Sequence, residues 1–198
     1  MEDAMEDIRK FVQDFAKQTY KVLPDHIGAW IVEYFLAKHG IVFEGKNSAE
    51  INPDDVGEPK LCFYNSAYLV QKHPGWKYFE GLILIDGIPI SIHHAWCLDE
   101  NNQLIEPTIV DNKSLKYIGI EIPLNEYAAE TSSLNTSVFD TGIGRNVPYF
   151  LNKDPDLKNM VSEKVLNTIE QFGLRVKNRL KTQENQELKE IIPFYGDK

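Results

Sequence analysis

Apolar residues recur at helical spacing near both ends of this 198-residue chain. Near the amino end they predict an amphipathic helix over 3–22, built on Ile8, Phe11, Val12, Phe15 and Ala16. A second helix, with Asp25 as a candidate N-cap, is expected to end before Gly40. A third is expected at about 155–181. We interpret these helices as packing elements rather than carriers of chemistry.

The middle of the chain changes from a polar loop to one helix and then to β-rich segments. Residues 44–59 form the loop, and Pro59 suits the first position of a helix that holds Cys62 in its first turn. Asp86-Gly87 is a hairpin signal between two apolar runs. The expected strands are residues 76–85, 88–98, 103–109 and 116–122. Residues 124–134 are compatible with a short helix, and 135–154 with a long loop.

A helix followed by an antiparallel meander, with further helices at both ends, is an α+β pattern. We expect a single domain over 1–198. Its core is expected at about 56–123, with N-terminal helices at 3–40 and the C-terminal helix outside that core.

Composition and charge narrow the classes of partner. The formal net charge is −9, which argues against nucleic acid as the main partner. No apolar run approaches the roughly 20 residues that span a bilayer, so no membrane association is expected. The start, MEDAMEDIRK, lacks the apolar core of a signal peptide, and two cysteines do not make a disulfide framework. We therefore expect a cytoplasmic protein with reduced thiols.

Cys62, His94 and Glu106 supply the residue types of a thiol catalytic triad. A thiol in the first turn of a helix meets unpaired N–H groups and the positive end of the dipole, which favour the thiolate. By strand alternation His94 shares a face with Trp96, whereas His93 and Cys97 leave the other face. We expect the thiol-bearing helix to cover the His94 face.

Glu106 is the candidate for the group that orients His94. A turn centred near residue 100 would place position 94 roughly opposite 106, where a carboxylate can fix the imidazole tautomer. The alternative is that Glu106 is a solvent-exposed residue. In that case Asp99 or Asp111 would be the next candidate carboxylate to orient His94, or the site would be a Cys–His dyad. Asn65, three residues after Cys62, could donate to an oxyanion or satisfy a local backbone group. Tyr78, Glu80 and Tyr117 are candidates to line the cleft, although a structural role is the more common one.

Two other motifs do not support a site. His93, His94 and Cys97 lack the spacing and the fourth ligand of a metal site. The segment GIG at 142–144 has no strand before it and no helix directly after it, so it is not a phosphate loop. No cofactor and no metal are expected.

The combination resembles the transglutaminase-like branch of the papain-related cysteine enzymes. The matching segments are Cys62 opening a helix, His94-Ala95-Trp96 on one strand and Glu106-Pro107-Thr108 on the next. Cys-x-x-Asn, Tyr-x-Glu-Gly and Tyr-x-Gly at 117–119 are similar to small bacterial and phage members of the superfamily. The resemblance covers about 60 residues, from Pro59 to Ile120. The sequence departs from the family at Glu106, where aspartate is usual.

The resemblance implies acyl transfer through a thioester on a protein or peptide-like amide. Cys62 would attack the carbonyl, His94 would shuttle the proton and Glu106 would orient His94, with Asn65, Trp96, Tyr78 and Tyr117 near the substrate or the oxyanion. Water as acceptor gives a protease, amidase or deamidase, and an amine gives a transglutaminase. The alternative is a catalytically silent binding or inhibitor module of the same fold. The oligomeric state is left open by the sequence.

Overall fold

The computed structural model has an α+β fold with a curled, five-stranded antiparallel sheet. It describes residues 2–26, 29–85, 88, 91–123, 137 and 147–171. The strands are β1 (Ile41–Glu44), β2 (Lys77–Ile85), β3 (Ser91–Leu98), β4 (Leu104–Ile105) and β5 (Leu115–Glu121). The α-helices include α1 (Glu2–Val22), α2 (Ile31–His39), α3 (Cys62–Lys72), α5 (Val147–Lys153) and α6 (Pro155–Met160), and two short 3₁₀ turns, η2 (Gly45–Asn47) and η3 (Pro53–Asp55), lie in the loop before α3.

The strands are arranged in the order β1-β5-β2-β3-β4. The predicted pairing of β2 with β3 is confirmed, although Asp86-Gly87 lies outside the described residues. The meander prediction is wrong after β4, because β5 pairs with β2 and not with β4. Strand β4 makes only two ladder pairs before Pro107, which has no N–H to donate. The apolar strand β5 therefore lies in the interior of the sheet, between β2 and β1.

Strand β1 was not expected, since residues 41–44 lie between the predicted helices and the predicted core. It pairs antiparallel with β5, with Val42 opposite Ile118 and Phe43 opposite Tyr117. The run of four residues is too short to show a convincing alternation in the sequence. The sheet therefore takes its edge strand from outside the expected core of 56–123.

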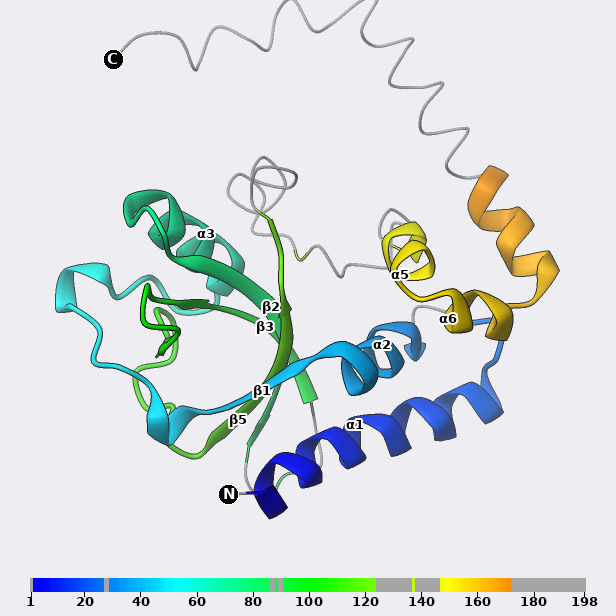
Figure 1. Ribbon diagram of the computed structural model, residues 1–198, viewed down its shortest axis with the longest axis horizontal. Helices are drawn as coiled ribbons and strands as arrows, with labels where there is room; N and C mark the ends of the chain where they lie inside the picture. The colour runs from blue at the N-terminus through cyan, green and yellow to red at the C-terminus, as the bar shows by residue number, and fades with distance from the viewer. Residues whose placement is uncertain are drawn as a thin grey trace, which may run out of the picture.

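The two faces of the sheet carry different cores. One face packs against α2 and α3 through a cluster that includes Tyr78, Leu82, Ala95 and Ile118. The other face holds an aromatic cluster in which Phe79, Trp96 and Tyr117 are fully buried. Figure 1 shows α1, α5 and α6 grouped around α2, whereas α3 lies apart from this group.

Two predicted helix starts are wrong. Helix α2 begins at Ile31 and not after Asp25, because Trp30 has a φ of −145°, outside the helical range, and its indole N–H donates to the Pro24 carbonyl over 3.3 Å. Helix α3 begins at Cys62 and not at Pro59. Lys60 has a φ of 71°, a left-handed conformation that a right-handed helix cannot include. Cys62 is thus the first residue of its helix.

The carboxy-terminal half differs most from the sequence-based expectation. Helix α5 lies where a loop was expected, and its buried side includes Val147, Phe150 and Leu151 at helical spacing. The long C-terminal helix is interrupted at 161–162, where the Ser162 hydroxyl accepts from the Val165 N–H over 3.4 Å and begins a new helix at 163–171. The continuation of that helix to 181 and the short helix at 124–134 lie outside the described residues. Within the described part of the chain, no helix combines the length and apolar character that crossing a bilayer requires.

Candidate functional site

His94 and Glu106 form a buried hydrogen-bonded pair. Nε2 of His94 lies 2.8 Å from Oε2 of Glu106, and the residues are 4% and 5% exposed. The β3–β4 ladder pairs Cys97 with Ile105 and Leu98 with Leu104, so its continuation would place Glu106 opposite Trp96. The predicted register, with Glu106 opposite His94, is therefore wrong by two residues. The contact still forms because the face is unchanged and a glutamate side chain spans the diagonal between the strands.

The Glu106 carboxylate accepts four hydrogen bonds. Oε1 accepts from the backbone N–H groups of Thr108 at 2.9 Å and Ile109 at 3.1 Å. Oε2 accepts from the Tyr117 hydroxyl at 3.0 Å and faces His94. Such a set of donors supports a carboxylate away from water and fixes its orientation. Glu106 is therefore not a solvent-exposed residue of an edge strand.

Cys62 completes the series. Its side chain interacts with His94 and raises the pKa of the imidazole, and Cys62 is 9% exposed at the first position of α3. Because Nε2 of the imidazole faces Glu106, Nδ1 is the nitrogen left for the thiol. The helix N-terminus adds N–H groups that have no acceptor within the helix. The three residues singled out in the sequence thus lie in the order thiol, imidazole, carboxylate.

The electrostatic balance favours a protonated His94. Burial lowers the pKa of His94. Hydrogen bonds to Cys62 and Glu106 and the charge of Glu106 raise it by a larger amount, to about 9. The same imidazole ring lies 6.3 Å from the Tyr117 ring, centroid to centroid. At neutral pH the site therefore holds an imidazolium between the Cys62 side chain and the Glu106 carboxylate.

Helix α3 covers the opposite face of β3 from the one predicted. The Cys97 thiol donates to the Ser66 carbonyl over 3.3 Å, and Cys97 packs with Leu69 and Ile105. Alternation along β3 places His94 on the other face. Because β4 pairs with β3 only at Cys97 and Leu98, it does not cover the edge of β3 beside His94. Cys62, the first residue of α3, nevertheless interacts with the imidazole.

Asn65 links the two segments that flank the site. Its amide donates to the Glu58 carbonyl at 2.8 Å and to the Thr108 hydroxyl at 3.0 Å. Gly57 packs so closely that an added Cβ would lie 2.1 Å from the Asn65 amide carbon. The amide therefore joins the loop before Cys62 to the segment after Glu106, and an oxyanion role for Asn65 stays a prediction.

The aromatic residues expected near a substrate lie in the interior. Trp96 and Tyr117 are 0% exposed, and their rings pack edge to face with centroids 5.1 Å apart. Tyr78 is 1% exposed, and its hydroxyl donates to Glu80 over 2.7 Å. Contact between any of these three rings and a substrate would require the site to open, so that role stays a prediction.

The alternative carboxylates do not contact His94 in the structure. Asp99 is engaged in its own turn, where Oδ1 accepts from the N–H groups of Asn101 at 2.9 Å and Gln103 at 2.7 Å. Asp111 is exposed. Over the described ranges, no group of three or more His, Cys, Asp and Glu side chains is arranged to hold a metal ion.

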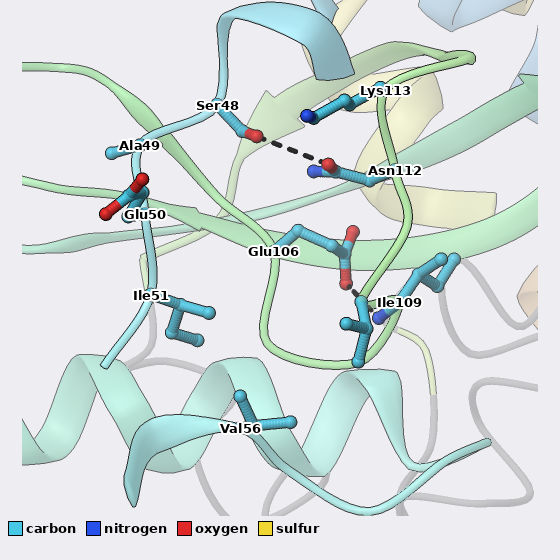
Figure 2. Close-up of a pocket in the computed structure, with 10 residues that line it drawn as sticks. Ser48, Ala49, Glu50, Ile51, Val56, Glu106, Ile109, Asn112 and Lys113 are labelled. Carbon is cyan, nitrogen blue, oxygen red and sulfur yellow. Dashed lines mark hydrogen bonds between the residues drawn. The ribbon is translucent and has the colours of Figure 1, made fainter. Parts of the chain in front are cut away.

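A pocket of about 180 Å³ opens beside Glu106 (Figure 2). It lies between the segment before α3 and the segment after Glu106, and it is lined by Ser48, Ala49, Glu50, Ile51, Val56, Glu106, Ile109, Val110, Asn112 and Lys113. Sequence reasoning missed Ser48 and Asn112, which meet across this pocket with the serine hydroxyl 3.3 Å from the Asn112 carbonyl oxygen. They are polar residues in loops, and nothing in the sequence pattern distinguishes them from other loop residues.

Comparison of the chain with protein-family models, curated proteins and solved structures found no match.

Proposed function

We propose that this protein is a thiol-dependent acyl-transfer enzyme with the catalytic arrangement of papain-related and transglutaminase-like enzymes. The observation that supports the proposal is the buried series of Cys62, His94 and Glu106 at the N-terminus of α3, in which Glu106 is hydrogen-bonded to His94 and Cys62 interacts with the same imidazole. A nucleophile, a base and a group that orients the base are the three parts that thiol catalysis requires. A carboxylate held by two backbone N–H groups has a fixed position and can therefore fix the orientation of the imidazole.

In the first half-reaction Cys62 and His94 react as a thiolate–imidazolium pair, in which the thiol proton is already on His94, and Sγ attacks the carbonyl carbon of an amide. The tetrahedral oxyanion that forms lies near the free N–H groups of the first turn of α3, which are suited to stabilise it. The carbon–nitrogen bond then breaks as His94 returns the proton to the leaving nitrogen. The products are a free amine or ammonia and a thioester on Cys62.

In the second half-reaction an acceptor attacks the thioester carbonyl while His94 takes the acceptor's proton. The carbon–sulfur bond breaks, and the proton stays on His94, which restores the thiolate–imidazolium pair. Water as the acceptor releases a carboxylic acid, whereas an amine forms a new amide. Glu106 keeps Nε2 of His94 protonated throughout, so that Nδ1 exchanges the proton with sulfur. The substrate class is a protein or peptide-like amide.

The first experiment is alkylation by iodoacetamide, read by peptide mass spectrometry between pH 5 and pH 9. Cys62 is expected to react faster than free cysteine near pH 6, and His94→Ala is expected to remove that advantage. Cys97→Ala is the matched control, because Cys97 is fully buried and points away from His94. A Cys62 that reacts no faster than free cysteine at any pH would support the silent binding module instead.

The second experiment looks for the thioester. The folded protein is incubated with a mixture of glutamine-containing peptides, and acylation is followed by intact mass with hydroxylamine as the trapping amine. A hydroxylamine-sensitive adduct on the parent that is absent from Cys62→Ala supports acyl transfer. The release of ammonia or of a shortened peptide then separates attack on a side-chain amide from attack on the peptide bond.

A further inference from the structure

We propose that Tyr117 is a positioning residue that fixes the orientation of the Glu106 carboxylate toward His94. Because its hydroxyl shares one carboxylate oxygen with His94, it also reduces the stabilisation of the imidazolium by Glu106. The consequence for catalysis rests on the proposed function, whereas the effect on His94 itself does not. Sequence reasoning placed Tyr117 near the substrate, and the hydrogen bonds assign it this different part.

The geometry begins with one shared oxygen. Oε2 of Glu106 lies 3.0 Å from the Tyr117 hydroxyl and 2.8 Å from Nε2 of His94. Tyr117 lies on β5, an interior strand, and its ring is fully buried against Trp96. The hydroxyl therefore has a fixed place, and with the two backbone donors at Oε1 it prevents the carboxylate from rotating away from His94.

Asn112 orients the Tyr117 hydroxyl. A hydrogen bond from Asn112 lowers the pKa of Tyr117, which is the effect of a donor on the phenol oxygen. The Asn112 carbonyl oxygen accepts from the Ser48 hydroxyl, as Figure 2 shows, and the group of Asn112 that can donate to the phenol is its amide NH₂. With its oxygen accepting from Asn112, Tyr117 directs its own proton toward Glu106.

Tyr117 stays a donor over the whole working range of pH. Burial and the charge of Glu106 raise the pKa of Tyr117 far above its ordinary value. A neutral hydroxyl that donates to Oε2 withdraws charge from the oxygen that also holds His94. The hydroxyl bond is stronger when His94 is neutral, because a neutral imidazole draws less charge from Oε2 than an imidazolium does. Tyr117 therefore favours the neutral imidazole and keeps His94 able to release its proton.

The test is Tyr117→Phe, which keeps the ring and its packing and removes only the hydroxyl. His94 is titrated by NMR of the ring in histidine-labelled protein. The groups that affect this titration are Cys62 from α3, Glu106 after β4 and Tyr117 from β5. The pKa of His94 is expected to rise above that of the parent. Acyl-enzyme formation is expected to slow by roughly 10- to 100-fold, the size expected when one hydrogen bond to a charged group is lost.

Site-specific 3-fluorotyrosine at position 117 gives the opposite perturbation. Its more acidic hydroxyl is a stronger donor, so the pKa of His94 is expected to fall relative to the parent. Tyr78→Phe is the structural control, because Tyr78 is also buried and donates to a buried carboxylate, Glu80, over 2.7 Å. Its thermal stability is expected to fall as in Tyr117→Phe, while the His94 titration stays in place.

A His94 pKa that is unmoved or lowered in Tyr117→Phe would overturn the proposal. This outcome is independent of the proposed function, since the titration requires neither a substrate nor a reactive thiol. Conversely, an unreactive Cys62 with the expected shifts at His94 would overturn acyl transfer and leave the positioning by Tyr117 supported.

Discussion

Replacing Glu106 by glutamine tests the orientation of His94 most directly. The side chain keeps its length, so the diagonal reach from β4 to His94 is retained. Its carbonyl oxygen is expected to stay at Oε1, because two backbone N–H groups point there. The NH₂ group then takes the place of Oε2 and faces Nε2 of His94. A donor at that position selects the imidazole tautomer with its proton on Nδ1, where the thiol needs a base.

The size of the effect follows from the charge balance at His94. Its pKa of about 9 lies above the ordinary 6.5 despite burial, which corresponds to roughly 3 kcal/mol of added stability for the imidazolium. Glu106 and Cys62 supply this together, so removing the Glu106 charge is expected to lower the pKa of His94 by about 1–2 units. The wrong tautomer adds to the loss. We expect acyl-enzyme formation to slow by about 10²- to 10³-fold, less than the ~10⁴ seen for a serine triad, because a thiolate is intrinsically nucleophilic.

Two measurements decide the matter. Ring ¹⁵N shifts of labelled histidine give both the pKa and the tautomer of His94, and urea melts show whether the variant is as stable as the parent. Asp99→Asn is the control, since its carboxylate contacts the turn and not His94. If Glu106→Gln is folded and His94 keeps both its pKa and its tautomer, Glu106 does not orient the imidazole.

Three further predictions use other parts of the structure. His93→Ala should keep most of the acyl-transfer rate, whereas His94→Ala should lose at least about 10²-fold as a lost general base does; equal losses would refute the assigned strand faces. As pH rises through about 9, acyl-enzyme formation should decline because His94 loses the proton that the leaving nitrogen takes; a rate still rising at pH 10 would contradict this. Burial raises the pKa of Asp154, but hydrogen bonds from His39, Lys38 and the backbone lower it from 3.8 to about 2, so its stabilisation is present above about pH 4 and is lost as pH falls toward 2. Asp154→Asn should therefore lower the free energy of unfolding by about 2 kcal/mol at pH 7. In urea melts the variant should also lose less of this free energy than the parent as pH falls from about 4 toward 2.

The residues of the candidate site could be found from the sequence because each has a local signal. Cys62 follows a proline-containing turn, and His94 and Glu106 lie on either side of the turn at residues 99–102. The alternation of side chains along the strand correctly predicted that His94 and Cys97 lie on opposite faces of β3. Register was less accessible, because the turn fixes pairing only to within a residue or two and β4 is two residues long.

The arrangement in space was harder to infer for a physical reason. The position of β5 beside β2 depends on contacts between residues far apart in the chain, such as Gly81 and Gly119, which no local pattern records. The same holds for the face covered by α3, since its apolar side fits either face of a sheet that is buried on both. The hydrogen bond from Asn112 to Tyr117 joins a loop to a strand and has no sequence signature.

The two cysteines allow the opening of the folded protein and the reactivity of the site to be measured in one labelling experiment. Cys97 is 0% exposed beneath α3, and burial raises the pKa of its thiol, so it can be alkylated only when the helix leaves the sheet. Its labelling rate under native conditions therefore measures the free energy of that opening, in the manner of a protected amide. Cys62 reports the chemistry of the site in the same sample. A single time course resolved by peptide thus separates a variant that is chemically impaired from one that only opens more often.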